Sequence, residues 1–258
     1  MAELLVERRG AIAVLTLHRP DRLNAVDEAL YERLLAALAD LQQDRSARAI
    51  VLAGAGRAFC VGADLVGHRQ ADRDDQQRRH YAELGQRAAR ALLTHRLPVV
   101  AAVHGHAIGA GLELALACDL LVVGDDAKLR FPEFGLGTFV GGGVLRTLVA
   151  RVGATKAREL LLLGRFFTGR DAAAFGLANQ AAPAGEVPAL AQALAEELAT
   201  KAPRSLALAK QLLAAPPADL DALLAAECDA LLQCMTTSDW REGVAAFAAR
   251  RDPHFTGD

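Results

Sequence analysis

The chain has 258 residues, of which 52% are apolar and 23% are charged, so it can bury a large core and is not a disordered segment. Its 29 basic and 31 acidic residues give a net charge of -2, which leaves no positive field to attract nucleic acid. No apolar run reaches the roughly 18 residues that span a bilayer, and charged residues interrupt the first ten positions, where a signal peptide would be apolar. We therefore expect a soluble cytoplasmic protein without a nucleic-acid or membrane partner.

The residues that most often bind metals or attack substrates are poorly placed for either role. The four cysteines are widely spaced in mostly apolar surroundings and form no C-x-x-C pair, which favours buried free thiols over disulfides or a zinc site. His104 and His106 have no third ligand at zinc spacing, so hydrogen-bonded loop residues are their simpler interpretation and no metal is expected. None of Ser46, Ser205 and Ser238 lies in a G-x-S-x-G motif, which argues against a serine hydrolase.

Short apolar runs alternate with helical patterns through the first half of the chain. Residues 11–17 predict a strand, and residues 27–41 predict an amphipathic helix because leucines recur there at helical spacing. Residues 49–53, 98–103 and 120–123 predict further strands, and the last two are apolar on both faces, as in strands covered on both sides. This alternation predicts an α/β fold, a sheet crossed by helices.

The rest of the chain is predicted to be mainly helical. Residues 69–90 contain six arginines and four acidic residues, for which a solvated helical face is the simplest interpretation. After about residue 150 the strand signals stop, and alanine- and leucine-rich helices follow. We expect a core domain at residues 1–195 and a helical region at residues 196–258.

A loop bracketed by glycines, residues 56–65, follows the strand at 49–53. Gly62 frees the backbone to turn so that the Ala63 N–H can point into a cavity. Asp64 stands where a helix N-cap would stand. The segment is equally compatible with a plain connection from a loop to a helix.

A second loop, residues 104–114, connects a buried strand to an apolar helix. Gly109, Ala110 and Gly111 are small enough for the first helical turn to approach a ligand, and its free N–H groups favour negative charge. A developing oxyanion therefore fits at the Ala110 N–H. The sequence matches neither the P-loop nor the dinucleotide-binding spacing.

Two carboxylates stand among apolar neighbours near these loops. Glu113 lies in the first turn of the apolar helix, where it either stabilises the helix N-terminus or, with a raised pKa, transfers protons. Glu133 lies between aromatic residues after Pro132, which stiffens the backbone, and residues 141–143 are glycines that permit close approach. Two such acids beside two candidate oxyanion loops indicate acid/base chemistry on a molecule that develops an enolate.

Six segments in order along the chain resemble motifs of the crotonase superfamily, the enoyl-CoA hydratase/isomerase family. They are residues 18–25, 56–65, 108–119, 131–143, 168–172 and 240–247. The resemblance covers essentially the whole chain and implies a crotonase-like ββα superhelix, or spiral, that carries the acyl-CoA site. It also implies that the C-terminal helices form a trimerisation region, and hence a homotrimer or a hexamer that is a dimer of trimers.

The resemblance further implies the chemistry of the site. The family holds an acyl-CoA thioester carbonyl between two backbone N–H groups, which fall here on Ala63 and Ala110. In its hydratases two glutamates hold and activate a water molecule for addition across the C2–C3 double bond, and these fall on Glu113 and Glu133. The implied protein is an enoyl-CoA hydratase of fatty acid metabolism that needs no cofactor, because coenzyme A is part of the substrate.

The resemblance also implies a set of substrate and CoA contacts. These contacts are expected at Arg22, Ala58, Cys60, Asp64, Leu65, Gly109 and Gly141. A cation suits the CoA phosphates, which makes Arg22 a candidate for that role, with a plain surface charge as the alternative.

The chain departs from the family pattern at two places. Ala110 stands where members often have glycine, so its methyl group narrows the pocket while its N–H is retained. Phe139 and Val140 stand where hydratases frequently have Ile-Pro, which bears on the acyl specificity. The alternatives are an isomerase, for which Glu133 alone would suffice, an acyl-CoA hydrolase, or a non-catalytic relative that binds RNA or CoA.

Overall fold

The computed structural model describes residues 3–70 and 73–258, which contain two sheets and ten α-helices. The strands are β1 (Leu4–Arg9), β2 (Ile12–Leu17), β3 (Ala49–Gly54), β4 (Val99–Val103), β5 (His106–Ile108), β6 (Leu120–Gly124), β7 (Lys128–Arg130), β8 (Phe167–Thr168) and β9 (Gln180–Ala182). The helices are α1 (Glu28–Gln43), α2 (Leu65–Gln70), α3 (Asp75–Thr94), α4 (Ala110–Leu116), α5 (Val144–Leu163), α6 (Gly169–Ala174), α7 (Val187–Ala199), α8 (Pro203–Ala214), α9 (Leu220–Met235) and α10 (Ser238–Ala249). The predicted α/β class is confirmed.

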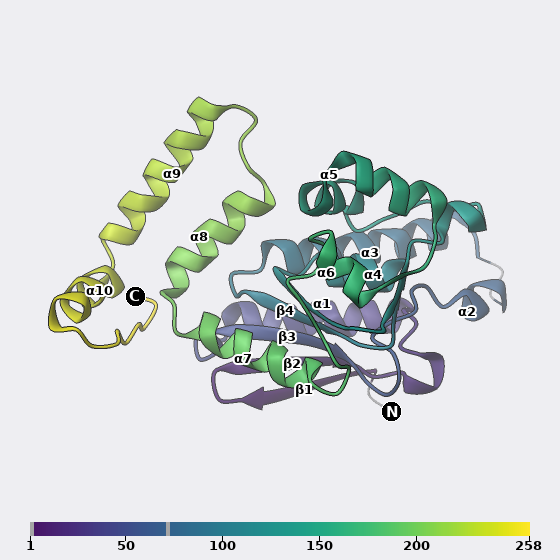
Figure 1. Ribbon diagram of the computed structural model, residues 1–258, viewed down its shortest axis with the longest axis horizontal. Helices are drawn as coiled ribbons and strands as arrows, with labels where there is room; N and C mark the ends of the chain where they lie inside the picture. Colours follow the sequence, from purple (N-terminus) through teal and green to yellow (C-terminus); the bar gives the residue numbers. More distant parts are fainter. Residues whose placement is uncertain (1–2, 71–72) are drawn as a thin grey trace.

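The larger sheet has the strand order β1-β2-β3-β4-β6-β9. Figure 1 labels the four strands from β1 to β4, which lie side by side. Its strands are parallel except β1, which pairs antiparallel with β2. The smaller sheet has the order β5-β7-β8. Because β3 and β4 are parallel neighbours, the loops that follow them leave the same edge of the sheet, where ligands bind in open α/β sheets.

The inner strands of the larger sheet are buried on both faces, whereas the edge strand β1 is mostly exposed. Alternate residues of β4, such as Ala101 and Val103, belong to the core that includes α1 and α3, whereas Val100 and Ala102 pack with α7. All five β4 residues are buried, so the prediction of strands covered on both sides is confirmed for this strand.

The two amphipathic helices of the first half follow their sequence patterns. The Asp27 side chain caps α1 by accepting a 2.9 Å hydrogen bond from the Leu30 N–H, and the helix buries the leucine face that the spacing predicts. The expected solvated face at residues 69–90 lies mainly on α3, where Arg78, Arg79, Arg87 and Arg90 are exposed. Residues 71 and 72 of that stretch lie outside the described residues.

The structure contradicts two expectations about the second half. Strands do occur after residue 150, since β8 pairs with β7 and β9 pairs with β6. The β9 sequence, Gln-Ala-Ala, has little strand propensity and is extended because its backbone pairs with a neighbour distant in sequence. Cys60 and Cys118 are buried as expected, but Cys228 is exposed on α9 and Cys234 is partly exposed, because that apolar helix lies at the surface.

The C-terminal helices α8, α9 and α10 extend away from the sheets (Figure 1). Lys210 of α8 anchors them, since its Nζ donates to the Asp119 carboxylate at 2.7 Å and to the Leu97 carbonyl at 3.0 Å. Helix α7 runs through residue 195, where the sequence placed the domain boundary, and that boundary stays a prediction. Within the described ranges, no helix is both long enough and apolar enough to cross a bilayer.

Candidate active site

Two loops run side by side from the carboxyl ends of β3 and β4. The Phe59 and Cys60 N–H groups donate to the carbonyls of His104 and His106 at 2.9 and 3.0 Å. The Ile108 N–H donates back to the Cys60 carbonyl at 3.0 Å. These bonds give the loop that contains Ala63 a fixed position beside the loop that begins α4.

Gly62 lets the two loops touch where they turn. Its φ is +90°, and a methyl group added there would lie 2.7 Å from the Ile108 carbonyl oxygen and 3.4 Å from the Ala110 nitrogen. Ala63 follows this glycine, and Ala110 is the first residue of α4, whose N–H has no acceptor within the helix. In the described part of the chain, neither of these two N–H groups donates a hydrogen bond. Two free amide donors therefore stand beside each other.

Glu113 lies in the first turn of α4 and is only 8% exposed. Its Oε1 accepts a 2.6 Å hydrogen bond from the Gly141 N–H. Burial raises the pKa of Glu113 to about 7, although the Gly141 hydrogen bond opposes this effect, and the nearby charge of Glu133 adds to it. A carboxyl group with this pKa can hold or release a proton near neutral pH.

Glu133 begins the short 3-10 helix Glu133–Leu136 and is also 8% exposed. Its Oε1 lies against the start of α4, since a methyl group added to Gly109 would be 2.5 Å away. Burial raises the pKa of this carboxyl above its ordinary value. Its Oε2 is buried with no hydrogen-bond partner among the described residues, so it is available to a polar group of a bound molecule.

The start of α4 thus brings together the four groups that the sequence singled out. The helix contributes the Ala110 N–H and Glu113, while the loop before it touches Gly62 and Glu133. Amide donors favour a substrate oxygen that becomes negative, and carboxyl groups with raised pKa values favour proton transfer beside it. The arrangement suits addition or proton transfer next to a carbonyl group.

The comparison with known families decides the relationship. The family model described as enoyl-CoA hydratase/isomerase matches residues 7–258. The chain belongs to this family.

Individual members of the enoyl-CoA hydratase/isomerase family resemble the chain over its whole length. The 2,3-dehydroadipyl-CoA hydratase of Escherichia coli is 35% identical over 258 residues and is aligned over 100% of both chains. The short-chain-enoyl-CoA hydratase of Clostridium acetobutylicum is 30% identical, covering 96% of this chain and 95% of that protein. The crystal structure of an enoyl-CoA hydratase from Bacillus anthracis has a TM-score of 0.94 at 30% identity, with 99% and 100% of the two chains covered. The predicted crotonase-like fold is confirmed.

The expected substrate and CoA contacts are distributed unevenly around the two acids. Gly109 and Gly141 lie directly against Glu133 and Glu113. The other positions fall into three groups: Arg22 and Leu65 are exposed, Ala58 and Cys60 are fully buried, and Asp64 is 8% exposed. The binding roles of all these residues stay predictions.

Asp64 has the helix-capping geometry that the sequence suggested. Its Oδ1 accepts a 3.0 Å hydrogen bond from the Gly67 N–H in the first turn of α2. Burial alone would raise the pKa of Asp64, but the Gly67 hydrogen bond and the Arg19 guanidinium lower it below its ordinary value. The carboxylate is therefore ionised and already bonded within the protein.

Arg19 and Asn24 support the site, although neither was predicted from the sequence to have a role there. Asn24 is 0% exposed, and its Nδ2 donates to the carbonyls of Ala55 and Ala58 at 2.8 Å. Arg19 donates to the Asp64 carboxylate at 3.0 Å. Both residues lie in the motif at 18–25, so the polar residues within that motif were the available signal.

His104 is a hydrogen-bonded loop residue, as expected, whereas His106 begins strand β5 and its Nδ1 is buried without a hydrogen-bond partner among the described residues. The His104 Nε2 lies 2.8 Å from the Gly56 carbonyl oxygen and bonds the two loops together. Across the described ranges, no group of three or more His, Cys, Asp or Glu side chains could hold a metal ion.

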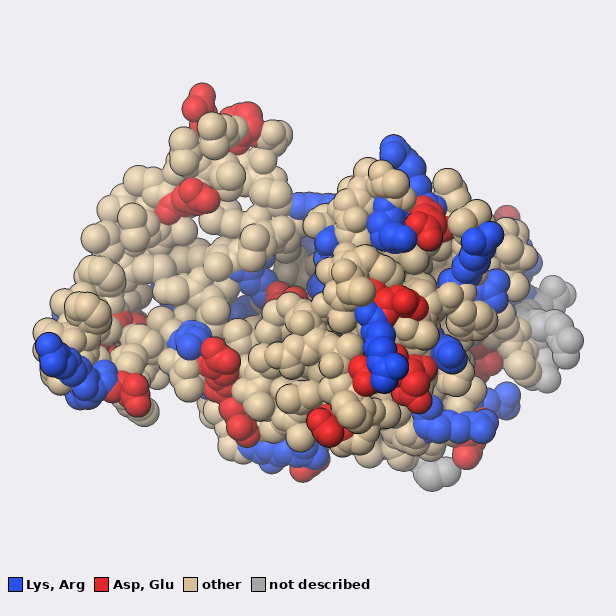
Figure 2. Space-filling model, in the orientation of Figure 1, with Lys and Arg blue, Asp and Glu red and all other residues tan. Residues whose placement is uncertain are grey.

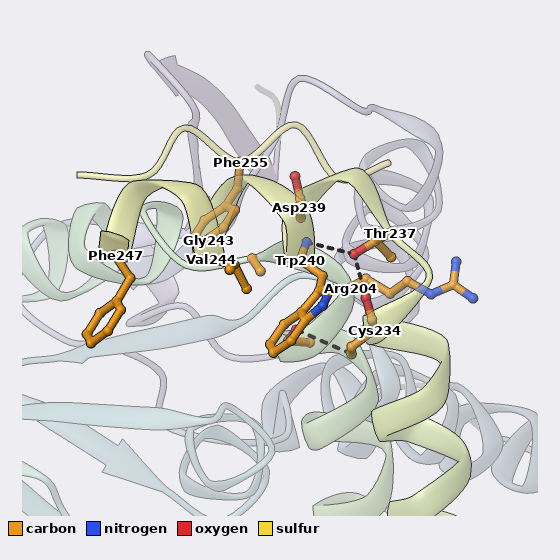
Figure 3. Close-up of a pocket in the computed structure, with 11 residues that line it drawn as sticks. Arg204, Cys234, Thr237, Asp239, Trp240, Gly243, Val244, Phe247 and Phe255 are labelled. Atoms are coloured by element: carbon orange, nitrogen blue, oxygen red, sulfur yellow. Dashed lines mark hydrogen bonds between the residues drawn. The ribbon is translucent and has the colours of Figure 1, made fainter. Parts of the chain in front are cut away.

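A groove of about 430 Å³ lies elsewhere, among α8, α10 and the end of α9 (Figure 3). Trp240, Val244 and Phe247 project from one side of α10 toward it, as their helical spacing requires. No glutamate lines this groove, so it is separate from the paired acids. Figure 2 shows acidic but no basic side chains over the neighbouring α9, whereas side chains of both signs are mixed over the core on the same face.

Proposed function

We propose that this protein is an enoyl-CoA hydratase that adds water across the C2–C3 double bond of a 2-enoyl-CoA thioester. The observation that carries the proposal is the convergence of Glu113 and Glu133 with the free N–H groups of Ala63 and Ala110 at the start of α4. Hydration needs each of these groups: donors for the thioester oxygen and two acids for the water and the proton.

The two amides stabilise the charge that develops on the thioester oxygen. As water attacks C3, electron density moves through C2 to this oxygen, which becomes enolate-like. Donors fixed before the reaction are worth about 2.7–4 kcal/mol each in comparable sites. Because Ala63 and Ala110 donate through the backbone, their N–H groups are retained with any residue there except proline.

The two carboxyl groups handle the water and its protons. Glu113 and Glu133 hold a water molecule whose oxygen bonds to C3, and the pair accepts one proton from that water. A carboxyl group of the pair delivers a proton to C2, so the product is a 3-hydroxyacyl-CoA and the pair ends with the number of protons it began with. Raised pKa values let the pair hold one proton near neutral pH.

The direct test is hydration by the purified protein. Crotonyl-CoA, a longer 2-enoyl-CoA and a 3-enoyl-CoA are each incubated with it, and the conjugated-thioester absorbance and the product mass are followed. We expect loss of absorbance and a mass increase of one water with the 2-enoyl substrates, and a loss of about 10²–10⁴-fold in Glu133→Gln. Conversion of only the 3-enoyl-CoA, without added water, would identify an isomerase instead, and hydrolysis would release free CoA.

We further propose that Arg22 binds the CoA phosphates and that the reaction needs no cofactor. Arg22 is exposed in the short helix Pro20–Arg22. It is close in sequence to Leu23 and Val26, whose backbones form hydrogen bonds with the loop that contains Ala63. Its replacement by Met should raise KM for crotonyl-CoA severalfold at unchanged kcat. Since carboxyl groups and amides supply all the chemistry, treatment with EDTA followed by gel filtration should leave the activity unchanged.

We also propose that the C-terminal helices join copies of the chain into a homotrimer, or into a hexamer of two trimers. Trp240, Val244 and Phe247 are 45%, 50% and 87% exposed beside the groove of Figure 3, as expected for an apolar interface. Sedimentation should give three or six times the 27.3 kDa chain mass. Phe247→Glu should lower that mass, whereas Leu5→Glu on β1 serves as the control.

A cytoplasmic location completes the proposal. All four cysteines are free thiols, as in a reducing compartment. Cell fractionation with an antibody against the protein tests this location.

A further inference from the structure

Arg19 joins the starts of two helices beside the candidate oxyanion site. One of its guanidinium nitrogens, Nη2, lies 3.0 Å from the Asp64 Oδ2 and 2.9 Å from the Asp27 Oδ2. Its Nη1 donates to the Ala25 carbonyl. The side chains of Arg19 and Asp64 are only 17% and 10% exposed, so solvent weakens their ion pair less than it weakens surface pairs.

Each aspartate uses its other oxygen as a helix cap. The Asp27 Oδ1 accepts from the Leu30 N–H at 2.9 Å, and the Asp64 Oδ1 accepts from the Gly67 N–H at 3.0 Å. The caps of α1 and α2 are therefore complete without Arg19. What the arginine adds is a connection between the two caps.

The connected segments determine where the Ala63 N–H points. The Val26 N–H donates to the Gly62 carbonyl at 2.8 Å, and the Asp64 N–H donates to the Val26 carbonyl at 3.0 Å. The peptide between Gly62 and Ala63 is trans, so its N–H points opposite to its carbonyl. With the Gly62 carbonyl directed at Val26, the Ala63 N–H is directed away from it.

We propose that Arg19 is a positioning residue for the oxyanion site: by connecting Asp64 to Asp27, it keeps Val26 paired with residues 62 and 64 and so fixes the direction of the Ala63 N–H. The inference rests on the proposed function. It differs from a capping role, because both caps remain when the guanidinium is removed. Without it, two carboxylates that share one nitrogen would face each other unscreened and separate the two segments.

The test compares three variants with the wild type in crotonyl-CoA hydration. Arg19→Met should lower kcat at least tenfold while KM changes less than threefold, since the lost contact acts in the transition state. Arg19→Lys keeps the positive charge but loses the planar guanidinium group, so its kcat should lie between those of the wild type and Arg19→Met. Arg96→Met is the matched control, because Arg96 is a partly buried arginine that bonds carbonyls at the other end of α1.

A crystal structure of Arg19→Met supplies a readout that does not depend on activity. We expect the hydrogen bond between the Val26 N–H and the Gly62 carbonyl to be broken and the Ala63 peptide to be rotated. The inference is overturned if this peptide is unchanged, if kcat stays within twofold of the wild type, or if Arg96→Met loses as much kcat. If the wild type hydrates no enoyl-CoA, the proposed function fails, and the crystal structure alone decides the role of Arg19.

Discussion

Replacing Glu113 by glutamine should stabilise the protein, and by more at high pH. Burial raises the pKa of Glu113 from 4.5 to about 7 in the folded protein. The folded state therefore binds a proton more tightly than the unfolded state, and stability falls as pH rises between 4.5 and about 7. At about 1.36 kcal/mol per pKa unit, the penalty reaches about 3 kcal/mol above pH 7.

The assay is urea unfolding of wild type and Glu113→Gln at pH 5 and pH 8. At pH 5 most of the penalty is absent, and the variant should be more stable by about 1 kcal/mol; at pH 8 the gain should be about 3 kcal/mol. The amide oxygen of glutamine can still accept the hydrogen bond from the Gly141 N–H, so this contact is kept. Protein concentration is held constant because association adds to apparent stability.

The matched control is Glu32→Gln, which removes an exposed carboxylate from α1. Its effect on the free energy of unfolding should be small at both pH values. Equal effects of Glu113→Gln at pH 5 and pH 8 would refute the reasoning, because they would mean that the Glu113 carboxyl titrates alike in the folded and unfolded states.

Three further predictions concern the same site. In a pH profile, kcat/KM for crotonyl-CoA should fall about tenfold per pH unit above about pH 7, as the pair loses its last proton; a flat profile to pH 9 would contradict the role of Glu113. Asn24→Ala should cost about 3 kcal/mol in urea unfolding, because it leaves several buried polar groups unpaired; a loss below 1 kcal/mol would contradict it. Gly109→Ala should lower kcat at least tenfold and lower the free energy of unfolding by about 1–3 kcal/mol, because the φ of Gly109 is +51° and the added methyl group would meet Glu133 Oε1. Wild-type kinetics in this variant would contradict the prediction by showing that the loop relaxes.

The parts of the fold that the sequence predicted are those set by local pattern. The buried face of α1 and the uniformly apolar β4 follow from residue spacing, because burial requires that spacing. The loops at 56–65 and 104–114 could be found because glycines stand beside chemically useful residues after apolar strands. The two acids could be found because carboxylates are rare in apolar segments.

The parts that the sequence did not predict depend on contacts between distant residues. Strand β9 has no strand pattern of its own and exists because β6 offers it backbone partners. Arg19 lies 45 residues from Asp64, and nothing in either segment indicates that they meet. The loop that carries Ala58 and Cys60 bonds with the 104–108 segment through its backbone, and nothing in either segment indicates this pairing.

The energetics of α4 explain why these supporting contacts are needed. The first turn of α4 leaves the Ala110 N–H unpaired and buries Glu113. The loop before α4 lies against the buried carboxyl group of Glu133, whose Oε2 is unpaired. Burying the two carboxyl groups costs stability, and the cost is greatest for the Glu133 Oε2, which has no hydrogen-bond partner among the described residues. Without other contacts to hold the backbone, the Ala110 N–H and the two carboxyl groups would turn toward one another or toward solvent. The hydrogen bonds of Asn24, Arg19 and Val26 hold the loop of residues 55–64 that lies beside the start of α4. Under the proposed function, a bound substrate and water would satisfy the unpaired groups there.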